Sequence, residues 1–342
     1  MRYILGVDIG NTKSHALLAD ENGRCVGLGQ AGPGSWEAIG WDGARQVLHD
    51  IVEQVLTQGG LSREAVAGAG FGYAGYDWPE DRPGHVAMVE SLGLVNARYA
   101  LGNDTLVGLV AGAEKGWGVV VVAGTSNNCR GRDRTGREGR VTGDGAALGE
   151  YGGALEIVTK AIQAVAAAWT RRGPPTALSD ALVAQVNAAD VADLLAGLVR
   201  DRYRLSPAVA PLVFAVAQGG DPVAQQIIVW AGQELGSLAL GVIDQLDLAA
   251  ETFDVVLSGS LYKGGEPLIE PMRQTIQAVA PGANLVRLNA PPVVGGVLLG
   301  MARAGLDPAG CRRSLLQSAS TLMMPWPEPT STAEKNERKR DT

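Results

Sequence analysis

The chain has 342 residues, of which 46% are hydrophobic and 19% are charged, and its formal net charge is −7. This length allows two domains with cores of their own, and the acidic balance argues against nucleic acid as a main partner. The three cysteines, Cys25, Cys129 and Cys311, follow no CxxC or Cys/His spacing and so give no pattern for a zinc or iron–sulfur site within one chain.

The N-terminal residues follow a strand pattern and lack the long apolar helix of a signal peptide. The apolar run over residues 119–123 is far too short to cross a bilayer. The odd, scattered cysteines fit a reducing compartment. Together these features predict a cytoplasmic protein with no membrane partner.

The first part of the chain alternates strands with helices. It opens with an antiparallel meander, and a helix over residues 42–58 then shows apolar residues at helical spacing before it ends at Gly59-Gly60. These elements predict one βββαβαβα lobe over residues 1–115. The predicted strands cover residues 3–8, 14–20, 24–28, 66–71 and 97–101, and the predicted helices cover residues 42–58, 85–92 and 105–114.

An altered copy of the opening unit begins the second half of the chain. Residues 3–30 and residues 117–141 each contain an apolar run, a Gly-rich polar turn, a polar strand, a tight turn and a third strand. The repeat predicts two related lobes, each of which brings a Gly-rich loop toward one cleft. Two facing loops can hold a polyphosphate from both sides, which favours nucleotide hydrolysis or phosphoryl transfer.

A second lobe is expected over residues 116–324, with a helical insertion after its meander. Its long apolar helices could form a homodimer face, although a monomer core explains them equally well. Residues 325–342 lack apolar content and are expected to form a disordered tail. The predicted helices cover residues 148–170, 179–187, 190–200, 206–217, 266–280 and 293–304 and one long helix that opens at Asp221-Pro222, and the predicted strands cover residues 253–257 and 284–288.

The first Gly-rich loop reads DIGNTK over residues 8–13. Asp8 ends a buried strand, where a carboxylate needs a cation or hydrogen-bond donors. Gly10 lets backbone N–H groups turn inward, and Thr12 and Lys13 add donors, which is the chemistry of an anion nest beside a Mg²⁺ site. An ordinary hairpin with a polar turn is the alternative, and the second loop of the same kind favours the functional interpretation.

Three later loops have similar positions. Residues 124–128, GTSNN, end a buried strand without an acidic residue, which suits phosphate oxygens. Gly259 and Ser260 also follow a strand, and their small size lets a flat ring approach the backbone. Gly295-Gly296 begins a helix that could pack against a strand or a nucleotide base. Each loop by itself is also compatible with a tight packing turn.

Asp104 follows one predicted strand and precedes a predicted helix. Ligands collect outside the carboxyl ends of the strands in such sheets, so this carboxylate is a candidate catalytic base. The alternative is that Asn103 or Asp104 serves only as the N-cap of the helix.

These motifs, in this order over residues 2–305, resemble the sugar kinase/actin/heat-shock chaperone superfamily. They are more similar to its N-acetylglucosamine kinase branch, which also contains the ATPase subunits of benzoyl-CoA reductase. VDIGNTKSHALLAD and AGTSNNCR resemble the two phosphate loops of that family, GNDTLVGLVAG its catalytic-Asp segment, LSGSLYKGG its adenosine motif and PPVVGGVLLGMA its closing Gly-Gly helix. The resemblance implies an α/β, two-lobed actin-like ATPase (ribonuclease H-like) fold, with duplicated βββαβα lobes around a nucleotide cleft.

Three positions that would contact a sugar depart from the family pattern. The Asp of the family's Gly-Asp-Glu-Gly-Ser loop falls on Glu150, and a second candidate, Asp144, lies six residues earlier. The family's Asn in the loop after the third strand falls near Ser35. The ATP motifs are therefore better kept than the acceptor motifs.

The resemblance implies a kinase that uses ATP and Mg²⁺ to phosphorylate a small hydroxylated acceptor, an amino sugar such as N-acetylglucosamine. An ATPase that drives a partner reductase, a non-catalytic sugar sensor and a kinase of a non-sugar acceptor are the alternatives. The resemblance implies Asp104 as the catalytic base, Asp8 at Mg²⁺, Gly10, Asn11, Thr12, Lys13, Gly124 and Thr125 at the phosphates, Gly259 and Ser260 at adenosine, and Ser35, Asn127, Glu150 or Asp144 at the acceptor.

Overall fold

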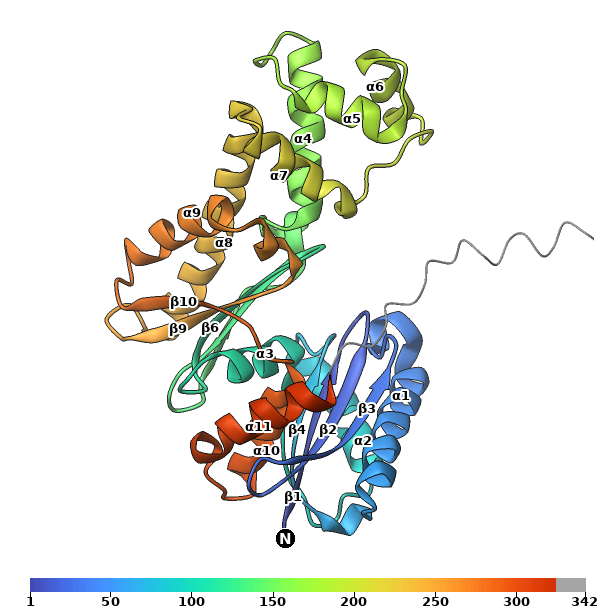
Figure 1. Cartoon of the computed structure of the whole chain (residues 1–342), viewed down its shortest axis with the longest axis vertical. Helices are drawn as coiled ribbons and strands as arrows, with labels where there is room; N and C mark the ends of the chain where they lie inside the picture. Colours follow the sequence, from blue (N-terminus) through green and yellow to red (C-terminus); the bar gives the residue numbers. More distant parts are fainter. Residues whose placement is uncertain (324–342) are drawn as a thin grey trace, which may run out of the picture.

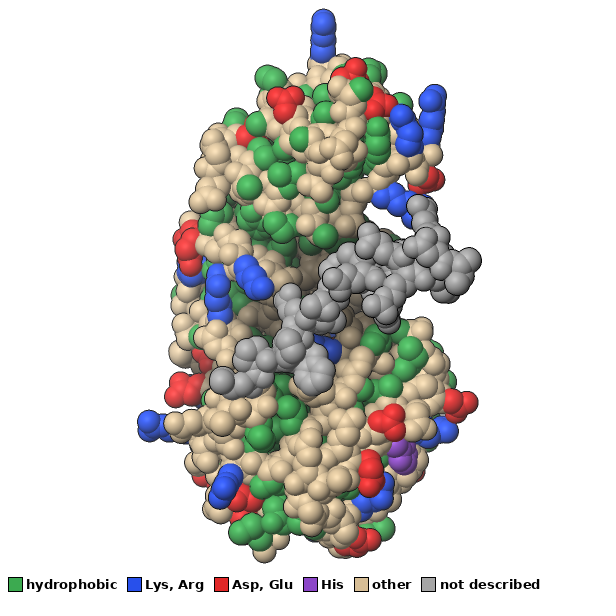
Figure 2. All heavy atoms as spheres, turned by 45° about the vertical axis from the view of Figure 1, so that its right-hand side comes forward, with side chains coloured by type: hydrophobic (Ala, Val, Ile, Leu, Met, Phe, Trp, Pro, Cys, Tyr) green, Lys and Arg blue, Asp and Glu red, His purple; other side chains and the backbone are tan. Residues whose placement is uncertain are grey.

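The computed structural model describes residues 1–323, which form two lobes stacked along the long axis of the molecule (Figure 1). The tail predicted over residues 325–342 lies outside the described residues. On the face shown in Figure 2, Lys and Arg side chains are interspersed with Asp and Glu side chains over both lobes.

The first lobe is built on a five-stranded sheet with the order β3-β2-β1-β4-β5. β2 pairs with β1 and β3 in antiparallel fashion, whereas β1, β4 and β5 are parallel. The carboxyl ends of the three parallel strands therefore meet at one edge, which carries Asp8, the loop after Tyr73, and Asp104. The strands are β1 (Tyr3–Ile9), β2 (Ser14–Asp20), β3 (Cys25–Ala31), β4 (Val66–Tyr73) and β5 (Arg98–Asn103).

Helices cover both faces of this sheet, and side chains that alternate along each strand contact them in turn. Leu5 and Val7 face a core shared with α1 (Trp36–Gly59) and α2 (Arg82–Ser91). Ile4 faces the opposite core, in which α10 (Val293–Arg303) and α11 (Pro308–Leu322) pack. α3 (Asp104–Gly112) lies between this lobe and the second sheet (Figure 1).

The second sheet repeats the first in strand order and direction. Its order is β10-β9-β6-β7-β8, in which β6, β7 and β8 take the places of β1, β2 and β3. β6 and β9 are parallel, as are β9 and β10, and the meander is antiparallel. The predicted duplication is therefore confirmed. The strands are β6 (Gly118–Ala123), β7 (Asn127–Arg132), β8 (Glu138–Arg140), β9 (Phe253–Ser258) and β10 (Ala283–Arg287).

The helical insertion projects from the far end of the second lobe (Figure 1). Among the described helices, α8 (Pro222–Gln245) is the one unbroken helix long and apolar enough to cross a membrane, but 56% of its most apolar window is buried inside the protein, as in a core helix. The bent pair α5 (Leu178–Val186) and α6 (Val191–Val199) passes the same test only if the two helices count as one span. The helices of this lobe are α4 (Ala154–Trp169), α5 (Leu178–Val186), α6 (Val191–Val199), α7 (Ala210–Gln218), α8 (Pro222–Gln245) and α9 (Glu266–Gln277).

The predicted helix over residues 148–170 is wrong at its start. Residues 145–148 form a short 3₁₀ turn, and α4 begins only at Ala154. Gly149 and Gly152 explain the difference, because their φ angles of 80° and 110° lie in the left-handed region, which interrupts a right-handed helix. The interruption leaves Glu150 in a loop ahead of α4.

The chain returns to the first lobe after β10, although the sequence predicted that residues 116–324 would form the second lobe. α10 lies directly on the first sheet, where a Cβ atom added at Gly70 would be 2.1 Å from the carbonyl oxygen of Gly296. α11, which the sequence did not predict, buries Leu315 and Ala319 in the same core. Glycines on facing elements thus allow helix and sheet to approach closely.

Candidate active site

The first Gly-rich loop turns tightly after β1. The backbone N–H of Gly10 donates to the carbonyl oxygen of Lys13 at 3.1 Å, and a Cβ atom added at Gly10 would lie 2.8 Å from the same oxygen. Asn11, Thr12 and Lys13 are exposed. The loop therefore presents its donors to solvent at the edge of the first sheet.

Asp8 and Asp104 influence each other electrostatically at this edge. Burial, together with the charge of Asp104, raises the pKa of Asp8 to about 8, and Lys13 opposes the shift. Two carboxyl groups in this position disfavour each other's ionised form. Mg²⁺ prefers oxygen ligands and is usually held by one or two carboxylates together with substrate phosphates, so the side chains present fit that ion.

Asp104 is the first residue of α3, and its neighbour caps that helix. The Oδ1 atom of Asn103 accepts from the backbone N–H of Thr105 at 2.9 Å in the N-cap position. Asp104 Oδ1 accepts from the same N–H at 2.8 Å. Burial is the main cause that raises the pKa of Asp104 to about 6, and this hydrogen bond opposes the rise. A carboxylate with a pKa near neutrality is well suited to accept a proton.

The second Gly-rich loop is anchored to the start of α4. The carbonyl oxygens of Gly124 and Thr125 accept from the backbone N–H groups of Ala154 and Leu155 at 2.9 and 3.1 Å. Thr125 is exposed, whereas Asn127 is buried and its Oδ1 atom has no hydrogen-bond partner among the described residues. The loop therefore combines the exposed hydroxyl groups of Thr125 and Ser126 with the buried Asn127 Oδ1 atom, which can accept from a ligand.

Glu150 is buried and is bound by its own loop. One carboxylate oxygen accepts from the backbone N–H and hydroxyl of Thr142 at 2.6 and 2.8 Å, and the other accepts from the N–H of Gly143 at 2.8 Å. Glu156, not Glu150, closes the start of α4 by accepting from the N–H of Gly153 at 2.8 Å. Asp144 is exposed within the same loop. Glu150 thus fixes the shape of the loop that carries Asp144.

Gly259 brings the end of β9 against the end of β6. Its φ angle is 115°, and a Cβ atom added there would lie 2.2 Å from the carbonyl oxygen of Ala123. This contact places Gly259 and the exposed Ser260 beside the second Gly-rich loop. A side chain at position 259 would force the two loops apart.

Ser35 precedes α1 and is fully buried. Its hydroxyl has no hydrogen-bond partner within residues 1–323. The adjacent Trp36 donates from Nε1 to the carbonyl oxygen of Gly75 at 2.7 Å, which joins the start of α1 to the loop after β4. An unpaired buried hydroxyl is costly unless a ligand or water completes it.

Residues 5–300 match the model of the BadF/BadG/BcrA/BcrD ATPase family. The chain belongs to this family. It is 25% identical to the N-acetylmuramic acid/N-acetylglucosamine kinase of Clostridium acetobutylicum, over 87% of this chain and 98% of that one. It is 26% identical to the N-acetyl-D-glucosamine kinase of Dictyostelium discoideum, over 87% of this chain and 97% of that one.

Solved structures share the fold of this family member. A structure from Chromobacterium violaceum, named as a candidate N-acetylglucosamine kinase, has a TM-score of 0.62 at 22% identity and covers 87% of this chain and 99% of its own. The ROK hexokinase of Thermus thermophilus has a TM-score of 0.52 at 19% identity, and the match covers 89% of this chain and 99% of the hexokinase chain. The predicted resemblance and the two-lobed kinase-like fold are confirmed.

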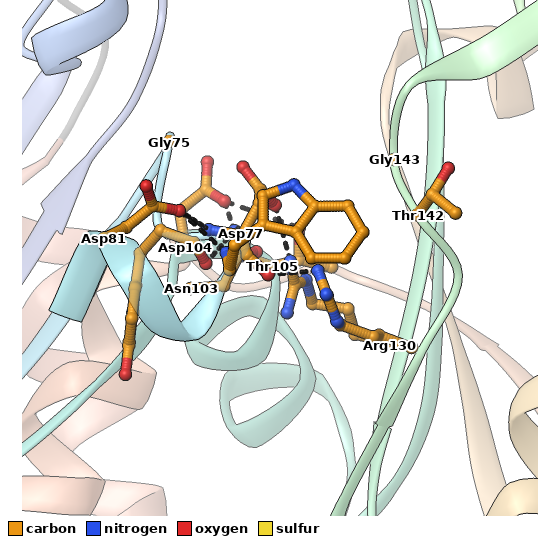
Figure 3. A network of polar contacts seen from close by, with 12 residues as sticks. Gly75, Asp77, Asp81, Asn103, Asp104, Thr105, Arg130, Thr142 and Gly143 are labelled. Atoms are coloured by element: carbon orange, nitrogen blue, oxygen red, sulfur yellow. Dashed lines mark hydrogen bonds and ion pairs between the residues drawn. The ribbon is translucent and has the colours of Figure 1, made fainter. Parts of the chain in front are cut away.

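Sequence reasoning missed two charged residues that join the lobes of this ATPase family member. Asp77, in the loop after β4, forms an ion pair with Arg130 of β7 at 2.5 Å. Figure 3 shows Asp77, Asn103 and Arg130 meeting beside Asp104. The aromatic, Gly-rich stretch over residues 72–84 marks a loop in the sequence, but nothing local identifies a partner on β7.

Proposed function

We propose that this protein transfers a phosphoryl group from ATP to a hydroxyl group of an amino sugar. The observation that carries the proposal is the match, over nearly the whole length of both chains, to two relatives named as N-acetylglucosamine kinases. Membership of an ATPase family supports ATP as the donor.

In this proposal Asp104 accepts the proton of the attacking hydroxyl. Its position at the end of a parallel strand and its pKa of about 6 support this role, because a base with that pKa is largely ionised at neutral pH. The backbone hydrogen bond from Thr105 holds the carboxylate in one orientation. Phosphoryl transfer depends mainly on such positioning and on neutralising charge.

The two Gly-rich loops would hold the phosphates. Asn11, Thr12 and Lys13 are exposed on one side and Thr125 on the other, and Gly10 and Gly124 shape the turns. Asp8 would hold Mg²⁺, which supplies the positive charge that neutralises the phosphate oxygens. Gly259 and Ser260 would line the adenosine site, because the close contact of Gly259 with Ala123 places them beside the second loop.

The acceptor would bind next to Asp104. The unpaired buried Ser35 hydroxyl and Asn127 Oδ1 support this placement, since each could bind a sugar hydroxyl or amide. The Glu150 carboxylate is already bound by Thr142 and Gly143. We therefore propose that Glu150 shapes the acceptor loop and that Asp144 is the side chain of that loop free to meet a sugar. We also propose a cytoplasmic location, because the proposed reaction consumes ATP, and a homodimer as the assembly.

The test is a panel of acceptors with the purified full chain and Mg-ATP. N-acetylglucosamine, glucosamine, N-acetylmuramic acid and glucose are compared by ADP release and by mass spectrometry of the sugar. We expect phosphorylation of an amino sugar at a kcat/KM above that for glucose. ATP hydrolysis that no sugar accelerates would indicate an ATPase that drives a partner. Sugar binding without turnover would indicate a sensor.

A further inference from the structure

The loop between β4 and α2 is folded around one carboxylate. The backbone N–H groups of Asp77 and Trp78 both donate to Asp81 Oδ2, at 3.0 and 2.7 Å. This fixes the backbone ahead of α2. The side chain and carbonyl group of Asp77 are then available to other partners.

Two arginines of the second lobe bind this loop. Arg130 of β7 pairs with the Asp77 carboxylate, and Arg140 of β8 donates to the Asp77 carbonyl oxygen. The guanidinium group of Arg140 also lies over the Trp78 ring, 4.1 Å from its centroid. We call these four residues, Asp77, Trp78, Arg130 and Arg140, the interlobe contact.

Arg130 is the buried member of the interlobe contact. Only 5% of its surface is exposed, and its Nε atom has no partner in the described part of the chain. Such a buried ion pair adds little net stability compared with apolar side chains of similar size. A role other than stability is therefore the better explanation for placing it between two lobes.

The interlobe contact reaches the catalytic side of the site through Asn103. Asn103 Nδ2 donates to Asp77 Oδ1 and to the carbonyl oxygen of Tyr76, both at 3.3 Å. The Oδ1 atom of the same amide caps α3 at Thr105. The side-chain amide of Asn103 thus sets the start of α3 and with it the backbone of Asp104. This amide is held by the Asp77 carboxylate, which Arg130 binds (Figure 3).

We propose that Asp77 is a positioning residue. Arg130 holds the Asp77 carboxylate when the lobes are closed. Asp77 then orients Asn103 and, through it, the start of α3, which carries Asp104. This inference rests on the proposed kinase function. Its consequence is that the base is correctly placed only when the second lobe is docked. Closure would thereby favour transfer to the bound acceptor over transfer to water.

The variants Asp77→Asn, Arg130→Met, Arg130→Lys and the double variant Asp77→Asn/Arg130→Met test this role. Arg137→Met is the matched control, because Arg137 lies on the same hairpin but pairs with Asp133 and Asp247, both in the second lobe. We measure kcat, the KM of ATP and of the sugar, ATP hydrolysis without sugar, and the radius of gyration by small-angle X-ray scattering.

We expect Asp77→Asn and Arg130→Met to lower kcat by about 10- to 100-fold, the usual cost of a misplaced catalytic group, with the KM of ATP unchanged. The ratio of hydrolysis to transfer and the radius of gyration should rise in both. Arg130→Lys should recover part of kcat, and the double variant should lose no more than the worse single variant, because the two act as a unit. The control should match wild type throughout.

Wild-type kcat with an unchanged hydrolysis ratio in Asp77→Asn and Arg130→Met would overturn the inference. Losses in the two variants that multiply in the double variant would also overturn it. If Asp77→Asn does not fold, the comparison of Arg130→Lys with Arg130→Met carries the same test. A wild-type chain that phosphorylates no sugar refutes the proposed function instead, and the scattering comparison still reports whether the contact closes the lobes.

Discussion

Replacing Asp104 with Asn should remove the catalytic base and leave the fold intact. Asn has the same shape and can still accept from the Thr105 N–H, and Asn103 continues to cap α3. Loss of a general base lowers kcat by about 10²–10⁴, which corresponds to about 2.7–5.4 kcal/mol of transition-state stabilisation. The Kd of ATP should not change, since Asp104 is not assigned to the nucleotide.

The pH profile gives the same hypothesis a second measurement. The pKa of Asp104 is raised to about 6 by burial, and the base works only when ionised. With Mg²⁺ at a saturating concentration, where the bound cation would keep Asp8 ionised, activity is therefore retained above the pKa of Asp104 and lost as the pH falls through it. At pH 5 only about a tenth of such a group is ionised, so kcat should be about tenfold below its plateau. Asp104→Asn should show a flat, low residual rate over the same range.

Turnover and ATP affinity are measured by ADP release and calorimetry between pH 5 and 9. Asp190→Asn is the control, because Asp190 also lies at a helix start, where it accepts from Asp193 at 2.8 Å, but in the helical insertion. Asn is an equally good cap, so this variant should match wild type. Near-normal turnover of Asp104→Asn, or an acid limb that persists in it, would refute the role of Asp104 as base.

Three further substitutions test the rest of the site. Asp8→Ala should abolish Mg²⁺-dependent ATP binding in calorimetry. The Tm should stay at or above that of wild type, because the variant removes a carboxyl group whose charged form burial disfavours. Equal Mg-ATP affinity would show that Asp8 is not part of the site. Glu150→Ala should lower the Tm and raise the acceptor KM together. It removes hydrogen bonds such as those from Thr142, and a hydrogen bond to a charged group is worth about 1.5–3 kcal/mol. An unchanged Tm would contradict this expectation. Gly259→Ala should cost about 1–3 kcal/mol of stability, because the φ angle at this position is positive. It should also raise the KM of ATP. A wild-type KM would show that the contact with Ala123 does not shape the nucleotide site.

The sequence alone determined most of the elements and their duplication. Strand alternation, helical spacing and Gly-rich turns are local properties of the chain, so residues 3–30 and 117–141 predicted two matching meanders, and the two sheets have the same strand order. The same local signals placed Asp8 at the end of a strand and Gly10 and Gly124 in turns that follow strands. Their chemistry follows from residue type and spacing, which require no knowledge of distant contacts.

Only the tertiary structure decided which distant residues meet. Asp77 and Arg130 are 53 positions apart and pair because two lobes dock, and no local pattern encodes that docking. The start of α4 depended on Gly149 and Gly152 taking positive φ angles, which sequence permits but does not require. The partners of the Glu150 carboxylate likewise depended on how residues 142–150 close into a loop. Packing between elements selects one of several conformations that the local sequence allows, and that selection positions the site.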